Sequence, residues 1–67
     1  MTVACFAPPS LAAQLAELKR ERTMRGRVYP HLVASGKLKR HAADYQNLAL
    51  EAAIKTLERL VIEEARP

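Results

Sequence analysis

The sequence predicts an all-α fold, an antiparallel helical hairpin that pairs with a second copy as a homodimeric four-helix bundle. Two stretches carry apolar residues at spacings of three and four, and no stretch alternates as a strand would. Gly36, a residue that commonly ends helices, lies between them. The chain has 67 residues, and much of its 49% hydrophobic content is alanine. A chain this short has a marginal core of its own, so we expect a second chain to complete it.

The first helix is predicted over about residues 11–29. Residues 1–9 contain two consecutive prolines and no helical period, which indicates an extended or disordered lead-in before a hairpin domain at 10–67. Ser10 can cap the first turn, because its hydroxyl accepts a hydrogen bond from an unpaired amide. Pro30 lacks an amide hydrogen and disfavours helical geometry before it. We therefore expect a kink or break there, followed by a short turn over 31–35.

Two arginines interrupt the apolar stripe of the first helix. The stripe residues are Leu11, Leu15, Leu18, Tyr29 and Leu32. Arg22 and Arg25 lie within it, and a buried unpaired charge costs several kcal/mol, on the order of 3–5. In an antiparallel hairpin the facing candidates are Asp44, Asn47 and Glu51. These pairs could fix the helix register, or the arginines could lie in an open groove that receives an acidic partner; both interpretations stay open.

The second helix is predicted over about residues 39–65. Its stripe contains Ala43, Asn47, Leu50, Ile54, Leu57 and Val61. Leu48 and Ile62 lie off this stripe, which gives the helix more apolar surface than one partner helix covers. Exposed single aliphatic residues are common, so a monomer is the alternative. The residues expected to support self-association are Leu48, Leu50, Ile54, Leu57, Val61 and Ile62.

The charge is concentrated in the middle third of the chain. Residues 19–41 carry eight Lys or Arg against one Glu, whereas residues 1–18 carry −1 and residues 42–67 carry −2. Cations at the start of the second helix oppose the positive end of its dipole, and an anion would relieve that. The predicted partner or anion contacts are Arg22, Arg25, Arg27, Lys37, Lys39, Arg40 and His41. The alternative is a solvated basic surface that keeps the protein soluble.

No motif for catalysis, cofactor binding or metal binding is present in the sequence. His31 and His41 have no nucleophile or ligand at a recognisable spacing, and there is no HExxH or glycine-rich phosphate loop. Cys5 is the single cysteine, which excludes an internal disulfide and favours a reducing compartment. The uncharged N-terminal stretch is interrupted by prolines and too short to span a bilayer. We therefore expect a non-enzymatic, cytoplasmic protein without cofactor or metal.

The segment ELKRERTMRGRVYPHLVASGKL, residues 17–38, followed by Ala43-Asp44 and an aliphatic helix, resembles small uncharacterised prophage-encoded proteins of proteobacteria. The resemblance covers about residues 17–57. This sequence departs from that pattern at Arg22, where an aliphatic residue is usual, and at Lys39 to His41, where a cap and acidic residues are usual. The resemblance implies a phage setting in a bacterial host cell, in which small accessory proteins bind or inhibit host proteins.

Two functions follow as expectations. The first is a non-enzymatic helical protein-interaction module that forms a homo-oligomer, preferably a dimer, and binds an unidentified protein. The alternative is a basic nucleic-acid-binding accessory protein that contacts the phosphate backbone without reading bases, because the chain lacks the compact three-helix support of a DNA-reading helix-turn-helix. No membrane partner is expected.

Overall fold

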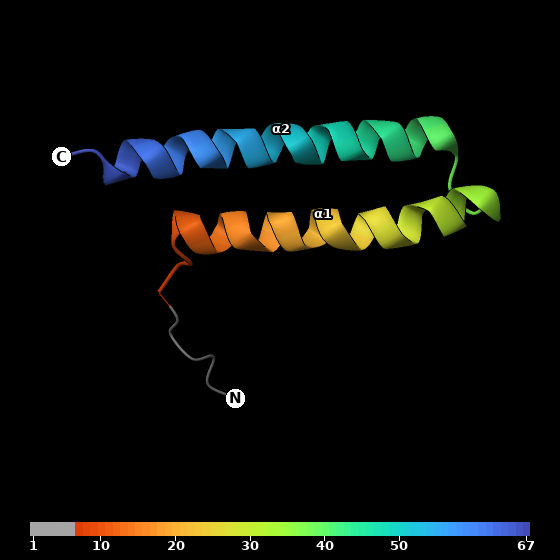
Figure 1. Cartoon of the computed structure of the whole chain (residues 1–67), viewed down its shortest axis with the longest axis horizontal. Coiled ribbons are helices and arrows are strands. Elements are labelled where there is room, and N and C mark those ends of the chain that lie inside the picture. The colour runs from red at the N-terminus through yellow and green to blue at the C-terminus, as the bar shows by residue number, and fades with distance from the viewer. Residues whose placement is uncertain (1–6) are drawn as a thin grey trace.

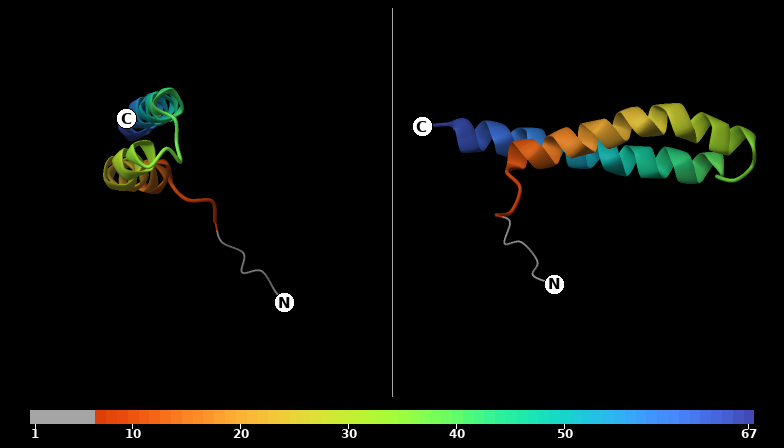
Figure 2. Two further views of the ribbon diagram at one scale, coloured as in Figure 1. Left: turned by 90° about the vertical axis from the view of Figure 1, so that its right-hand side faces the viewer. Right: turned by 90° about the horizontal axis from the view of Figure 1, so that it is seen from below.

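The computed structural model describes residues 7–67 and contains two helices, α1 (Leu11–Ala34) and α2 (Arg40–Ala65). They run antiparallel and lie side by side along their length (Figure 1). Views along and below the pair show that no third element covers either face within the described residues (Figure 2). The predicted all-α hairpin is confirmed. Most of the predicted lead-in, residues 1–6 with Cys5, lies outside the described part.

Ser10 begins α1 as predicted. Its backbone is extended, and its hydroxyl oxygen accepts a hydrogen bond from the Ala13 amide at 3.0 Å. The carbonyl of Pro9 also accepts a hydrogen bond from the Gln14 side chain at 3.0 Å. These bonds pair polar groups that a helix start otherwise leaves to water, so the first turn is fixed locally.

Pro30 lies inside α1, and the helix continues four residues beyond it to Ala34. The predicted end at residue 29 and the separate turn over 31–35 are therefore wrong. A proline in a helix loses one hydrogen bond, to the carbonyl four residues earlier, and crowds that carbonyl. Here the carbonyl belongs to Gly26. Tyr29 and Leu32, on either side of Pro30, are both partly buried against α2, and this packing keeps the backbone helical through the proline.

Gly36 ends α1, as the sequence predicts. Its φ is +78°, in the left-handed region that glycine adopts without steric cost. The Gly36 amide donates to the Val33 carbonyl at 3.1 Å, and the Lys37 amide donates to the Leu32 carbonyl at 2.9 Å. This pair of bonds is a Schellman motif, which satisfies the last carbonyls of the helix and turns the chain toward α2.

The start of α2 has no side-chain cap. α2 begins at Arg40, one residue later than predicted. Lys39 occupies the capping position and makes no capping hydrogen bond. The first turn contains no acidic residue. Lysine cannot accept a hydrogen bond from the free amides, and its charge opposes the helix dipole. The second helix therefore depends on packing against α1 more than on its own start signal.

The core of the hairpin is small. Only Ala43, Leu50 and Ile54 are buried among the described residues, all of them on α2, and Ile54 is the most enclosed at 1% exposure. The apolar stripe of α1, predicted as its buried face, is only partly covered by α2. Two amphipathic helices enclose one seam between them and leave their flanks in water.

Candidate functional site

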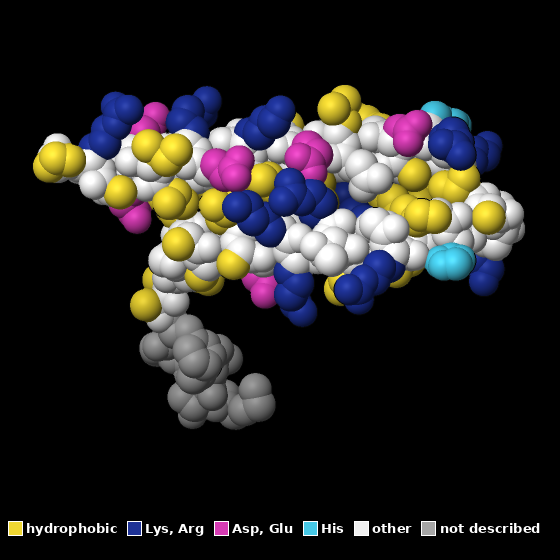
Figure 3. Space-filling model, in the orientation of Figure 1, with side chains coloured by type: hydrophobic (Ala, Val, Ile, Leu, Met, Phe, Trp, Pro, Cys, Tyr) yellow, Lys and Arg dark blue, Asp and Glu magenta, His cyan; other side chains and the backbone are white. Residues whose placement is uncertain are grey.

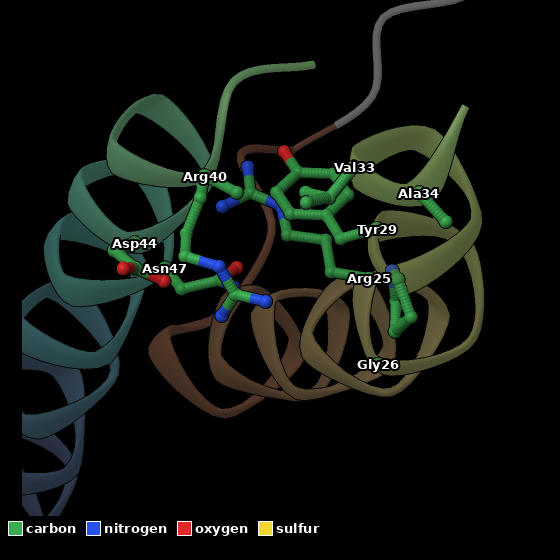
Figure 4. Close-up of a pocket in the computed structure, with 10 residues that line it drawn as sticks. Arg25, Gly26, Tyr29, Val33, Ala34, Arg40, Asp44 and Asn47 are labelled. Carbon is green, nitrogen blue, oxygen red and sulfur yellow. The ribbon is translucent and has the colours of Figure 1, made fainter. Parts of the chain in front are cut away.

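A groove between the two helices near the turn is the candidate site. Its volume is about 350 Å³. Figure 4 shows Arg25 and Tyr29 reaching from α1, and Arg40 and Asn47 from α2, into the space between the helices. Pro30, Val33, Ala34 and Ala43 supply apolar wall, and Asp44 stands on the α2 side. The groove thus combines an aromatic ring and aliphatic groups with two guanidinium groups.

Arg25 is held by three contacts within the chain. Its Nε donates to Glu21 Oε1 at 3.1 Å, one helical turn earlier, and its Nη1 donates to the Gln46 main-chain carbonyl at 3.0 Å. The guanidinium carbon lies 5.4 Å from the centre of the Tyr29 ring, a cation–π distance. The partners predicted for it on α2 were side chains. Arg25 instead donates hydrogen bonds to a backbone carbonyl of α2 and to Glu21 of its own helix, and these bonds hold its side chain between the two helices.

Arg22 pairs with Glu51, one of its predicted partners. Its Nη1 lies 3.2 Å from Glu51 Oε1 and 3.3 Å from Oε2. Lys19 and Glu58 form a second cross-helix ion pair at 3.3 Å. Both pairs join a basic side chain of α1 to an acidic side chain of α2, and Figure 3 presents a face on which acidic and basic side chains of the two helices meet. We call this the ion-pair face. These contacts match the register-fixing interpretation of Arg22.

Tyr29 and Gln46 make a contact that the sequence pattern does not indicate. The Tyr29 hydroxyl donates to Gln46 Oε1 at 2.7 Å. Gln46 therefore accepts two hydrogen bonds from α1, one from Tyr29 at its side-chain oxygen and one from Arg25 at its main-chain carbonyl. The only available sequence signal was that Tyr29 and Arg25 share one face of α1, since the acceptor depends on the exact helix register.

Arg40 is the guanidinium of the groove that has no partner. It makes no hydrogen bond or ion pair to any residue in the described range 7–67, although Asp44 follows one turn later on the same helix. The other predicted residues of the basic turn, Lys37, Lys39 and His41, are likewise exposed. Arg27 is exposed two positions after Arg25, so it points about 200° away and lies outside the groove.

The six predicted self-association residues fall into three environments. Leu50 and Ile54 are buried inside the hairpin, so α1 of the same chain already covers them. Leu57 and Val61 are half-buried along the seam. Leu48 and Ile62 are 71% and 60% exposed. The sequence did not single out Met24 and Val28, although both are substantially exposed on α1.

The described residues contain no group of three His, Cys, Asp or Glu side chains placed to hold a metal ion. Neither helix is long and apolar enough to cross a bilayer. A hydrogen bond to Glu17, supported by its charge, raises the pKa of Arg20, which leaves that arginine protonated at any physiological pH. The groove at the turn presents Arg40, which makes no ion pair within residues 7–67, together with the Asn47 amide and an apolar wall, a combination suited to recognition of another molecule.

No protein-family model, curated protein or solved structure matches this chain. The arguments for its function therefore depend on the geometry of the groove, on the exposed apolar surface and on the distribution of charge.

Proposed function

We propose that this protein is a non-enzymatic interaction module whose first partner is a second copy of itself. The observation that supports this most strongly is the imbalance between covered and uncovered apolar side chains. Three residues are buried in the described part of the chain, whereas five large hydrophobic residues are at least 44% exposed. Those five are Met24, Val28, Tyr45, Leu48 and Ile62, and of these Met24 and Val28 lie on the face proposed below for the second copy.

The surface area supports the same proposal. The chain exposes 5665 Å², whereas a compact protein of 7.5 kDa exposes about 4250 Å². The difference is roughly 1400 Å², and the exposed residues 7–9 contribute to it. A stable protein–protein interface buries about 800 Å² on each partner. The elongated hairpin is therefore not short of surface for one interface of this size.

The surface best suited to a second copy is the side of the hairpin opposite the ion-pair face. Around α1, Arg25 faces α2, Arg22 lies to one side of it, and Val28 lies about 60° to the other. Around α2, Ile54 faces α1, Glu51 lies to one side, and Ala53 lies about 100° to the other. Val28 and Ala53 therefore share a face.

We call this surface the alanine face. Its apolar members are Met24, Val28 and Leu32 of α1, and Ala49, Ala53, Leu57 and Leu60 of α2, and by helical position Glu17, Glu21 and Gln46 lie on the same side. At its open end a mainly apolar groove of about 380 Å³ lies between Leu57 and the first turns of α1. Small alanine side chains let helices approach closely, and the face bears no cross-helix ion pair within residues 7–67. A second hairpin packed here would complete a four-helix bundle.

The groove at the turn is the proposed contact for a further protein. Arg40 makes no ion pair with any described residue, and Tyr29, Pro30 and Val33 supply apolar wall beside it. An acidic segment carrying an aliphatic or aromatic residue would pair with the guanidinium and cover that wall. A prophage accessory protein that binds or inhibits a host protein in the bacterial cytoplasm would use such a contact. Arg22 and Arg25 would hold the two helices in register beside the groove and would not contact the partner, since both are hydrogen-bonded within the chain.

Sedimentation velocity on matched variants tests the self-association. Val28→Glu and Ala53→Glu each place a charge on the alanine face, and we expect both to shift the protein from dimer to monomer. Leu48→Glu changes a more exposed residue outside that face and should leave the dimer intact. Circular dichroism at 222 nm checks that each variant keeps its helices. A dimer that survives Val28→Glu and Ala53→Glu but is lost in Leu48→Glu would move the interface to the outer side of α2.

A nucleic-acid-binding role is the second candidate, and the exposed basic turn favours it. Lys37, Lys39 and Arg40 make no ion pair with any residue in the described part of the chain. This candidate predicts binding to duplex DNA or RNA of arbitrary sequence that weakens steeply with salt, with a log–log slope near −3 if these three cations contact phosphates. Neutralising all three to Gln should remove that binding. An absence of binding at 50 mM salt would reject the role.

A further inference from the structure

The two ends of the hairpin differ in charge. Residues 23–50, the half that contains the turn, carry five Lys or Arg against one acidic residue, Asp44. The open half of the described chain, residues 7–22 and 51–67, carries six Lys or Arg against six Glu. The entire net charge of +4 therefore lies in the turn half.

The open half also carries two exposed acidic residues at the C-terminal end of α2, Glu63 and Glu64. Glu64 makes no ion pair within residues 7–67, and Glu63 makes only a 4.0 Å contact with Arg59. Both lie in the last turns of α2, at the opposite end of the molecule from the turn (Figure 1). Glu64 follows Leu60 by four positions, so it continues the line of the alanine face.

Two symmetric pairings can bring one alanine face against another. A two-fold axis parallel to the helices puts both turns at the same end, and an axis perpendicular to the helices in the plane of the interface puts them at opposite ends. The first pairing sets α1 against α2 of the other copy, and the second sets α1 against α1 and α2 against α2. Charge distinguishes them, since like charges set side by side oppose association.

We infer that two copies pack through the alanine face with their turns at opposite ends, so that the basic turn half of each lies beside the neutral open half of the other, which carries Glu63 and Glu64. The inference rests on the self-association proposed above and adds the orientation. In this arrangement Lys39, which lies on the alanine-face side of α2, is near Glu64 of the second copy. The same-end arrangement would instead set +4 beside +4.

A spin-label distance measurement distinguishes the two arrangements. The probe is a nitroxide on Ser35→Cys, at the turn, in a Cys5→Ser background, read by double electron–electron resonance. Since α2 has 26 residues at about 1.5 Å each, turns at opposite ends put the labels about 40 Å apart or more. Turns at the same end put them below about 25 Å, because packed helices are about 8–10 Å apart. A distance below about 25 Å between the two Ser35→Cys labels would overturn the proposed orientation but would still be consistent with self-association.

A second label site separates failure of the orientation from failure of self-association. Thr23→Cys lies half-way along α1, so it gives an intermolecular distance below about 35 Å in either arrangement. No intermolecular distance at Thr23→Cys would overturn both proposals.

Neutralising the turn tests the electrostatic cause. With Lys37, Lys39 and Arg40 all changed to Gln, we expect the single long distance at Ser35→Cys to split into a long and a short population. Lys19→Gln is the matched control, since it removes one positive charge from the open half, and it should keep the long distance alone. A long distance unchanged in the triple variant would show that the turn charge does not set the orientation and would overturn the inference.

Discussion

Replacing Ile54 by alanine should remove much of the stability of the fold. Ile54 is 1% exposed, the most enclosed side chain of the described residues, in a core of only three. Removing its three outer carbons costs about 2–3 kcal/mol, toward the lower end of values for buried isoleucine because its half-exposed neighbours can close over the gap. A chain of this length has a total stability of about 3–10 kcal/mol. The expected fall in Tm is therefore about 10–20 °C.

Thermal unfolding followed by circular dichroism at 222 nm measures this, at one fixed protein concentration because association contributes to apparent stability. Leu48→Ala is the matched control. It shortens an aliphatic side chain of the same size on the same helix that is 71% exposed, and it should change the free energy of unfolding by less than about 0.5 kcal/mol. If Leu48→Ala lowers Tm as much as Ile54→Ala does, the core is not where the structure places it.

Three further changes test other parts of the fold by urea unfolding. Gly36→Ala should lower the free energy of unfolding by about 1 kcal/mol, because the φ of Gly36 is +78°. Gly26→Ala should raise it by about 0.5–1 kcal/mol, because Gly26 lies inside α1 with nothing within 4 Å of an added Cβ. Equal effects of the two variants would contradict the assigned turn. Lys39→Ser should stabilise α2 by about 0.5–1 kcal/mol by supplying a cap, and a loss would show that Lys39 has a role in the fold. A double-mutant cycle on Arg22 and Glu51 should give a coupling of about 0.2–1 kcal/mol, since both side chains are nearly half exposed, and zero coupling would reject the ion pair in solution.

The hairpin could be predicted because its signals are local. Ser10 and Gly36 act through bonds within a few residues, and both behave as their chemistry requires. Pro30 misled the prediction, because the proline rule describes an isolated helix. Here the packing of Tyr29 and Leu32 against α2 outweighs the loss of one hydrogen bond, and that packing is a tertiary effect.

The groove could be predicted only in part. Glu51, which pairs with Arg22, was one of three candidates that the antiparallel arrangement offered. The Glu21 partner of Arg25 was available from the spacing of four residues, but the Gln46 carbonyl was not, since any residue has a carbonyl and only the register decides which one is within reach. Stripe positions such as Leu50 were predicted as self-association contacts, yet one chain already buries this residue. Periodicity shows that a position is apolar and does not show which helix covers it.

We propose that this hairpin leaves an apolar face that a second copy covers, and sedimentation equilibrium of the full chain over a hundredfold range of concentration measures whether it does. We expect a mass near 15 kDa, twice the 7.5 kDa of one chain, that falls toward the monomer mass on dilution. A mass of 7.5 kDa at every concentration, together with a cooperative melting transition that does not depend on concentration, would contradict it.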